Sequence, residues 1–210
     1  MDLDLEKYIL EHIDAEEDVL RELDRFTHLN VLRARMLSGH LQGTLLKMLC
    51  RMINPQAVLE IGTFTGYSAI SMVRGLSSQA HIHTIEVNDE LESVIRRFFH
   101  KAGVSNQITL HIGDALDVID KLTMNFDLVF MDGDKRQYPA YYNAVFPRLN
   151  QGGYILADNI LWGGKVSQPN MPDDEYTKGI MDFNDMVKAD ARVEKVILPI
   201  RDGLTLIRKK

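Results

Sequence analysis

Oxygen-bearing side chains follow two apolar runs in the second half of the sequence. Asp132 comes directly after the run at 126–131, and Asp158 and Asn159 come after the run at 154–157. Two carboxylates and an amide oxygen suit a hard cation such as Mg²⁺, which takes about six oxygens at roughly 2.1 Å and keeps positions for water or substrate. If both runs are neighbouring parallel strands, about 4.8 Å apart, the three side chains reach one point. The pattern predicts a divalent-cation site; the alternative is that these residues only cap the turns after the strands.

A lysine three residues after Asp132 is the candidate base of this site. It is Lys135, in the segment Asp-Gly-Asp-Lys-Arg-Gln-Tyr at 132–138. A bound dication disfavours the charged form of a nearby lysine, which would suit Lys135 to remove a proton from a substrate. The alternative is an ordinary solvated lysine on the surface. Asp134, which precedes it, is equally well explained as a helix cap.

A glycine-bearing turn joins an apolar run to a helical pattern at 57–68, with the sequence Ala-Val-Leu-Glu-Ile-Gly-Thr-Phe-Thr-Gly-Tyr-Ser. Gly62 and Gly66 allow the backbone to approach a ligand closely, and the helix that follows offers free amide groups. A carboxylate at Glu60 would repel a pyrophosphate and favour a cationic amino-acid group. Glu86, about twenty residues after the loop, is placed to accept hydrogen bonds from ribose hydroxyls. These features favour S-adenosylmethionine over a dinucleotide, the alternative being an ordinary strand-to-helix turn.

The elements that must position these residues alternate between strands and helices. We expect strands at 57–59, 82–85, 108–112, 126–131 and 154–157, and helices at about 69–76, 91–102, 115–122 and 141–149. Such alternation predicts an α/β fold with a doubly wound, Rossmann-like sheet and helices on both faces. Right-handed crossovers then place the ends of the parallel strands on one edge of the sheet, where ligands bind.

The chain after residue 163 has a different pattern. Residues 163–172 are loop-like and 173–189 are helical, while 193–198 and 204–207 are two strands joined by a short connection. The short connection predicts a hairpin. The expected result is a mostly parallel seven-stranded sheet with one antiparallel strand.

Helices are also expected before the first strand. Apolar residues at helical spacing predict one or two amphipathic helices at 3–26 and another at 45–52. We therefore expect one domain over 1–210, with an N-terminal helical cap or dimerisation region at 1–53 and a Rossmann-like core at 54–210. The N-terminal helices are expected to cover the active site, to pair with another subunit, or both.

The composition limits the cellular compartment and the kinds of partner that the protein is expected to have. The 210 residues include 24 Lys and Arg against 30 Asp and Glu, a formal net charge of −6, which argues against a surface that follows nucleic-acid phosphates. Cys50 is the only cysteine in the sequence, so no intrachain disulfide is possible and a reducing compartment fits. The sequence shows no signal-peptide pattern and no apolar stretch near the roughly 18 residues of a membrane span. We expect a cytoplasmic protein without membrane contact.

Together these motifs resemble those of the cation-dependent O-methyltransferase family, which includes catechol and caffeoyl-coenzyme A O-methyltransferases and belongs to the class I S-adenosylmethionine-dependent methyltransferases. The resemblance is close over about 36–162 and rests on the segments at 59–68 and 132–138 and on the pair Asp158-Asn159. It implies a homodimer, S-adenosylmethionine as cofactor and a divalent cation, with Mg²⁺ expected.

The resemblance also implies a role for each motif residue. It assigns the methionine part of the cofactor to Glu60, Gly62 and Ser68, the ribose to Glu86, the adenine side to Asp114 and Ala115, and a closing segment to Met36 and Ser38. Asp132 is assigned to the cofactor and, with Asp158 and Asn159, to the cation; Lys135 is the implied catalytic base. For Met36, a role in the hydrophobic core is an equally good interpretation.

The predicted reaction is methyl transfer to a hydroxyl of a catechol-like small molecule. Its two adjacent oxygens would complete the shell of the cation. One alternative is a methyltransferase for hydroxylated uridine in transfer RNA, which the acidic charge disfavours. Another is a non-catalytic nucleotide-binding or regulatory module, which the intact site residues disfavour. The substrate cannot be read from the loop at 160–174, where Trp162 either stacks on an aromatic ring or packs under the loop.

Overall fold

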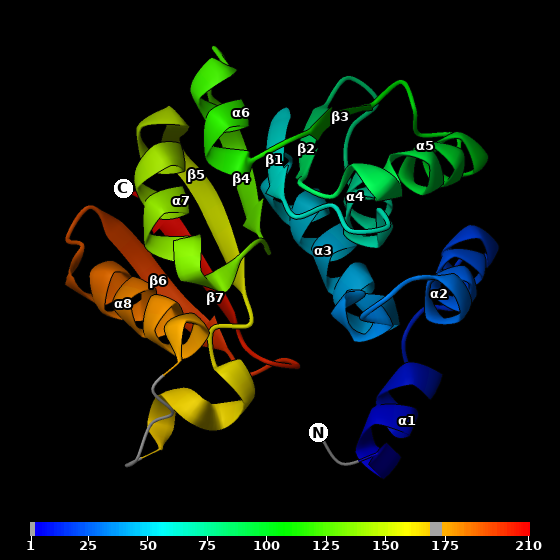
Figure 1. Cartoon of the computed structure of the whole chain (residues 1–210), viewed down its shortest axis with the longest axis horizontal. Coiled ribbons are helices and arrows are strands. Elements are labelled where there is room, and N and C mark those ends of the chain that lie inside the picture. The colour runs from blue at the N-terminus through cyan, green and yellow to red at the C-terminus, as the bar shows by residue number, and fades with distance from the viewer. Residues whose placement is uncertain (1–2, 169–173) are drawn as a thin grey trace.

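Seven strands form one sheet in the order β3-β2-β1-β4-β5-β7-β6 in the computed structural model (Figure 1), which describes residues 3–168 and 174–210. Strands β1 to β5 pair in parallel, and β7 runs antiparallel to both of its neighbours. The predicted sheet, with its one antiparallel strand, is confirmed. The strands are β1 Ala57–Ile61, β2 His81–Glu86, β3 Ile108–Ile112, β4 Phe126–Met131, β5 Leu149–Asp158, β6 Val193–Leu198 and β7 Leu204–Lys209.

Helices cover both faces of this sheet (Figure 1). Leu46, Ile70 and Phe98 belong to the buried cluster on one face, while Tyr142 and Phe183 belong to the cluster on the other. Because the central strands are buried on both faces, they read as continuous apolar runs rather than as an alternating pattern. The helices are α1 Leu3–Glu11, α2 Asp18–Asn30, α3 Gly39–Ile53, α4 Tyr67–Val73, α5 Glu92–Lys101, α6 Ala115–Lys121, α7 Tyr138–Val145 and α8 Glu175–Ala189.

Two predicted boundaries around β5 are wrong. The helix expected at 141–149 begins at Tyr138 and ends at Val145, because Pro147 lies in a short 3₁₀ turn that follows it. Strand β5 begins at Leu149, before Gly152 and Gly153, which the sequence analysis placed outside the strand. The pairing of β5 with β4 is irregular at this point, which accommodates the two glycines within the strand.

The segment after β5 is more ordered than the predicted loop. Residues Trp162–Ser167 form 3₁₀ turns with a kink at the two glycines between them. Helix α8 begins at Glu175, and the Asp174 side chain caps it by accepting a hydrogen bond from the Thr177 amide at 2.9 Å. Residues 169–173, which include the end of the predicted loop and the predicted first residue of the helix, lie outside the described residues.

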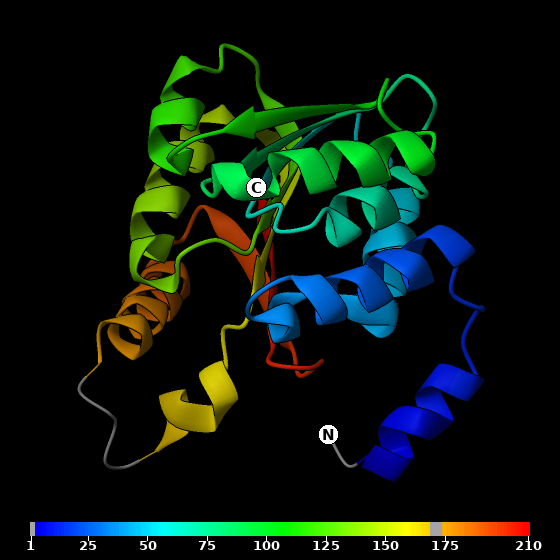
Figure 2. The ribbon, with the colours of Figure 1, turned by 45° about the vertical axis from the view of Figure 1, so that its right-hand side comes forward.

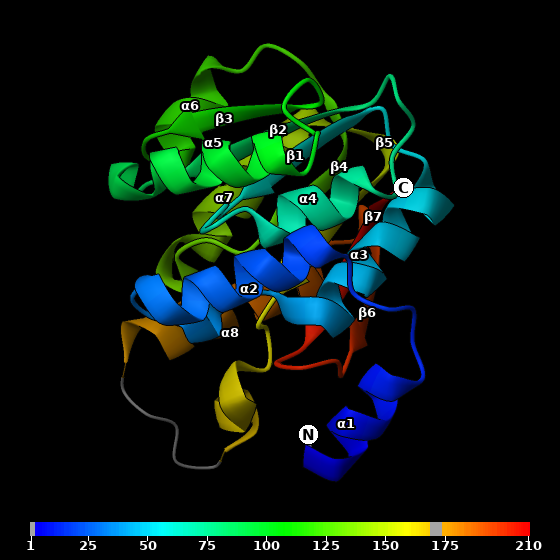
Figure 3. The same ribbon diagram turned by 90° about the vertical axis from the view of Figure 1, so that its right-hand side faces the viewer.

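The N-terminal region contains two helices before α3, as the sequence predicts, but α2 continues to Asn30, beyond the predicted end near residue 26. Helix α2 packs through Leu20 and Leu23, whereas α1 stands apart from the sheet and its helices (Figures 2 and 3). Leu5 and Tyr8 on α1 are more than half exposed. In the part of the chain that the structure describes, no helix has the length and apolar character needed to cross a membrane.

Candidate active site

The loop between β1 and α4 lies directly against the end of β4. Gly62 has a φ of 100°, and a Cβ atom there would lie 2.4 Å from the carbonyl oxygen of Asp132. Only glycine satisfies both the conformation and the space. The amide of Asp132 also donates to the carbonyl of Ile61 at 2.8 Å. The glycine loop and the first predicted cation ligand therefore belong to one site.

Glu60 is fully buried beneath the loop. Its carboxyl group accepts hydrogen bonds from the hydroxyls of Ser68 and of Thr84, the latter at 2.5 Å. Burial raises the pKa of Glu60 to about 8, although both hydroxyls act in the opposite direction. The sequence argument treated this side chain as a carboxylate, but the fold favours the protonated form at neutral pH in the absence of a nearby cation.

The predicted ribose and adenine residues lie next to each other along the same edge of the sheet. Glu86 accepts from the amides of Phe64 at 2.7 Å and Asn88 at 2.9 Å, and burial raises its pKa. The carbonyl of Glu86 accepts from the Gly113 amide at 2.8 Å, which places the following Asp114 and Ala115 beside it. Asp114 is also the N-cap of α6.

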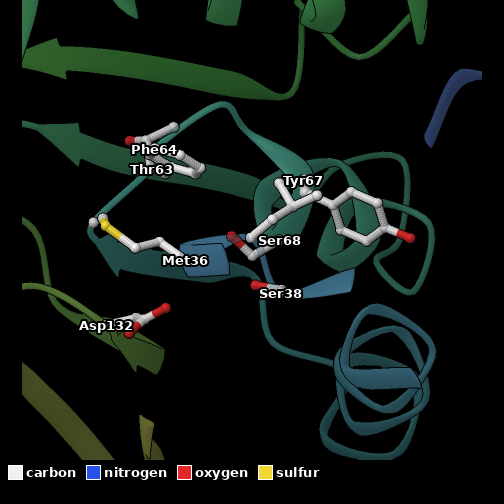
Figure 4. A pocket seen from close by; sticks show the side chains of 9 residues that line it. Met36, Ser38, Thr63, Phe64, Tyr67, Ser68 and Asp132 are labelled. Carbon is white, nitrogen blue, oxygen red and sulfur yellow. The ribbon is translucent and has the colours of Figure 1, made fainter. Parts of the chain in front are cut away.

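A small pocket lies between the glycine loop and the segment that precedes α3 (Figure 4). Five predicted site residues line it: Met36, Ser38, Gly62, Ser68 and Asp132. The remaining lining residues, which the sequence analysis did not identify as site residues, are Leu37, Thr63, Phe64 and Tyr67. Glu60, Glu86, Asp114 and Ala115 surround this region without lining the pocket.

Lys135 is buried, so its interpretation as a solvated lysine is wrong. Its Nζ donates to Asp132 Oδ1 and to the hydroxyl of Tyr138, each at 2.6 Å. The Tyr138 hydroxyl lies 2.9 Å from the carbonyl oxygens of Met131 and Asp158 and can donate to either. Burial raises the pKa of Asp132, the Asp158 carboxylate raises it further, and Lys135 opposes both effects. Lys135 and Tyr138 thus connect the ends of β4 and β5.

Asp158 and Asn159 end the neighbouring strand, as predicted. Asp158 Oδ2 accepts from Gln42 Nε2 at 2.7 Å, and Oδ1 accepts from the Asn159 amide at 2.9 Å. Asn159 has a φ of 59°, a conformation that asparagine tolerates better than most residues. Its side-chain amide forms no hydrogen bond with the described residues. Asp134, by contrast, accepts from the Arg136 amide at 3.0 Å and confirms the capping alternative.

The turn between β6 and β7 braces the segment after Asn159. A Cβ atom at Gly203 would lie 2.4 Å from Leu161 Cγ, and the Leu161 amide donates to the Asp202 carbonyl at 2.9 Å.

Trp162 stacks on Tyr176 with ring centroids 6.1 Å apart. The indole ring of Trp162 also packs against the buried cluster on this face of the sheet, and its buried N–H has no hydrogen-bond partner among the described residues.

Sequence reasoning missed Gln42 and Arg201. Gln42, Leu46 and Leu49 lie on the buried stripe of α3, so a polar residue at the first position was a usable signal. Arg201 donates to Gln42 Oε1 and to two backbone carbonyls from the turn between β6 and β7. Nothing in its sequence surroundings predicts this contact.

The sheet order, the glycine loop and the acidic residue at the end of β2 define an S-adenosylmethionine-dependent methyltransferase fold. The sequence profile described as O-methyltransferase matches residues 10–210, and the chain belongs to this family. Similar proteins include probable caffeoyl-CoA O-methyltransferase 2 of Dictyostelium discoideum, 34% identical over 96% of this chain and 90% of that protein. The caffeoyl-CoA O-methyltransferase of Petroselinum crispum is 34% identical over 98% of this chain and 90% of that protein.

A solved structure supports the cofactor. The SAH-bound methyltransferase PaMTH1 of Podospora anserina superposes with a TM-score of 0.91 at 28% identity, covering 99% of this chain and 94% of that one. SAH is the demethylated form of S-adenosylmethionine. The chain is an S-adenosylmethionine-dependent O-methyltransferase that resembles caffeoyl-CoA O-methyltransferases.

Proposed function

We propose that the chain methylates one hydroxyl of a small phenol that carries two adjacent hydroxyls, with the help of a divalent cation. The observation that carries this proposal is the gathering of Asp132, Lys135 and Asp158 at the ends of two neighbouring strands. Gly62 brings the cofactor loop to the same point. The names of the relatives, which specify caffeoyl-CoA, support a phenolic acceptor.

Asp132, Asp158 and Asn159 fit a hard cation such as Mg²⁺. The two carboxylates lie close enough for Asp158 to raise the pKa of Asp132, and the side-chain amide of Asn159 forms no hydrogen bond with the described residues. Among the described residues, no group of three or more His, Cys, Asp or Glu side chains could hold a metal ion. The proposed donor set therefore includes the side-chain amide oxygen of Asn159 beside the two carboxylates. When bound, the cation would lower the pKa of an acceptor hydroxyl and orient two adjacent acceptor oxygens.

Lys135 is the proposed base. Its Nζ is held by Tyr138 as well as by Asp132, so it stays in place when Asp132 takes another partner. Once Asp132 binds the cation instead, the Lys135 amine in its uncharged form would accept the proton of the acceptor hydroxyl. The acceptor oxygen then forms a bond to the methyl carbon as the bond between that carbon and sulfur breaks, which leaves S-adenosylhomocysteine. Holding both reactants in one site replaces a bimolecular encounter.

The donor side of the site is proposed to hold the cofactor through the edge formed by β1, β2 and β3. The support is the continuous arrangement of these residues along that edge and around the pocket. The proposed contacts are Glu60, Gly62 and Ser68 for the methionine part, Glu86 for the ribose, Asp114 and Ala115 for the adenine, and Met36, Ser38 and Asp132 around the pocket.

The direct test is methyl transfer from labelled S-adenosylmethionine to a simple catechol, with Mg²⁺ and then with a chelator. We expect turnover that chelation removes and added Mg²⁺ restores, with little effect of salt. Turnover that persists after chelation would contradict the cation. If only RNA is methylated, with activity that falls steeply as salt rises, the acceptor class is wrong. If SAH binds but the catechol does not react, RNA and larger acceptors are tested next, and binding without methyl transfer to catechols, thioesters or RNA would favour a non-catalytic module.

Glu60 provides a prediction about stability and pH. Between the ordinary pKa of 4.5 and about 8, the folded chain keeps a proton on Glu60 that the unfolded chain releases, so the free energy of unfolding falls as pH rises through this window. Glu60→Gln keeps a neutral group at this position, so its free energy of unfolding should not fall with pH for this reason. We expect its Tm to exceed that of the wild type by several degrees at pH 8.5 and by less at pH 5.5.

The same variant should bind SAH more weakly, because it removes the carboxyl group that is proposed to ionise and pair with the amino group of the ligand. Thermal unfolding at several pH values and calorimetric titration with SAH measure the two effects. Glu92→Gln, which removes a carboxylate from the partly exposed first turn of α5, is the control. A lower Tm for Glu60→Gln at pH 8.5 would contradict the protonated state.

A homodimer is proposed for the assembly and the cytoplasm for its setting. The exposed Leu5, Tyr8 and Leu10 on α1 support a helical region at 1–53 that pairs with another subunit or covers the acceptor, in front of the core at 54–210. The buried, unpaired Cys50 is compatible with a reducing compartment. Size-exclusion chromatography with light scattering should give twice the mass of the chain, and a monomer mass would contradict the dimer.

A further inference from the structure

Arg201 holds a backbone conformation that is unusual for its residue type. Its φ is 49°, in the left-handed region, where a side chain other than that of glycine or asparagine carries a cost. Its guanidinium group donates to the carbonyl oxygens of Leu37 and Ser38 and to Oε1 of Gln42. These three hydrogen bonds to charged donors offset the cost and fasten the β6–β7 turn to the beginning of α3.

The contact with Arg201 fixes the orientation of the Gln42 amide. Oε1 must face the guanidinium group, because the opposite orientation would place two sets of N–H donors against each other. Nε2 of Gln42 then faces Asp158 Oδ2, to which it donates at 2.7 Å. Gln42 is 1% exposed, so water does not replace either partner. A chain of hydrogen bonds therefore runs from Arg201 through Gln42 to Asp158.

This chain of hydrogen bonds ends at the Asp158 carboxylate, which otherwise accepts a hydrogen bond at only one of its oxygens among the described residues. Asp158 Oδ1 accepts from the Asn159 amide, and Gln42 holds Oδ2, so the two bonds together fix the plane of the carboxylate. Each oxygen keeps a lone pair for a further ligand. Leu37 and Ser38, whose carbonyls Arg201 also binds, line the cofactor pocket. Arg201 thus contacts the pocket segment directly and reaches Asp158 through Gln42.

We propose that Gln42 and Arg201 are positioning residues, which orient the Asp158 carboxylate for a divalent cation and hold the Leu37–Ser38 segment at the cofactor pocket. This inference rests on the proposed cation site. Hydrogen-bond partners of metal ligands typically contribute about 10- to 100-fold to metal affinity. Neither residue lines the pocket beside the glycine loop, so in this proposal both act through Asp158 and the segment before α3.

The test is titration of the full chain with Mn²⁺, followed by electron paramagnetic resonance, in the wild type and in Arg201→Gly and Gln42→Met. Glycine suits the positive φ at position 201, and methionine keeps the volume at the buried position 42, so both variants are expected to fold. We expect the dissociation constant for Mn²⁺ to rise about 10- to 100-fold in each. In the double variant we expect the dissociation constant to rise no further than in the more strongly affected single variant, because both changes break the same chain of hydrogen bonds.

Arg208→Ala is the matched control, since it removes an arginine that pairs with Glu194 on β6 and should leave Mn²⁺ affinity within twofold of the wild type. Unchanged affinity in Arg201→Gly and Gln42→Met, with binding lost in Asp158→Ala, would overturn this inference and leave the proposed cation site intact. Additive losses in the double variant would also overturn it. A wild type that does not bind Mn²⁺ would overturn both proposals.

Discussion

Replacing Asp158 with alanine should abolish cation-dependent methyl transfer and leave the affinity for SAH within a few-fold of the wild type. The carboxylate is buried at the end of β5, and Asp158 is not among the residues that line the pocket proposed for the cofactor. A cation supplies several kcal/mol at such a site, and each 1.4 kcal/mol corresponds to about a tenfold change in rate, so we expect kcat to fall by about 10³-fold or more. Initial rates with Mg²⁺ and calorimetric titration with SAH separate the two effects.

Asp158→Asn and Asp134→Ala complete this experiment. The asparagine variant keeps the size and one acceptor oxygen but removes the charge, so its cation affinity should lie between those of the wild type and Asp158→Ala. Asp134 caps a short helical turn and lies outside the proposed donor set, so its replacement should change kcat little. Full turnover of Asp158→Ala in the presence of Mg²⁺ would remove this residue from the cation site.

Replacing Lys135 with methionine should lower both the rate and the stability of the chain. Loss of a general base typically costs roughly 10²- to 10⁴-fold in rate. Asp132 would lose its partner at 2.6 Å and remain buried, and breaking one side of a buried ion pair costs about 3–5 kcal/mol. Because a cation can replace the missing positive charge, Mg²⁺ should raise the Tm of this variant more than that of the wild type.

Rates measured across pH and thermal unfolding with and without Mg²⁺ check these effects. Lys178→Met is the control, since Lys178 is exposed on α8 and pairs only with Asp182 among the described residues. It should leave both quantities unchanged. Lys135→Met with a wild-type kcat at every pH would show that another group, or water, takes the proton.

The chemistry-bearing residues of the acceptor half could be predicted because each follows an apolar run of its own. Asp132 and Asp158 end strands that are buried on both faces, so their position depended only on recognising β4 and β5 and on parallel pairing. The start of β5 was missed for a local reason. A pair of glycines usually indicates the end of a strand. Here Gly152 and Gly153 lie within β5, where its pairing with β4 is irregular.

Properties that depend on the packed structure could not be predicted. The contact between Arg201 and Gln42 joins residues that are 159 positions apart, and it exists only because the β6–β7 turn meets the beginning of α3. The protonation of Glu60 depends on complete burial, which the motif does not reveal. Lys135 was expected on the surface from residue type alone, but Tyr138 and Asp132 provide the partners that allow its burial.

The strand order places the two proposed halves of the site next to each other along one edge of the sheet. The residues proposed for the methyl donor lie at or near the ends of β1, β2 and β3, those proposed for the cation lie at or near the ends of β4 and β5, and Asp132 is assigned to both. The loop after β5 contacts the hairpin of β6 and β7 and helix α8, all of which lie on the acceptor side. Exchanging that loop between relatives should therefore alter the choice of acceptor and leave the affinity for the methyl donor intact.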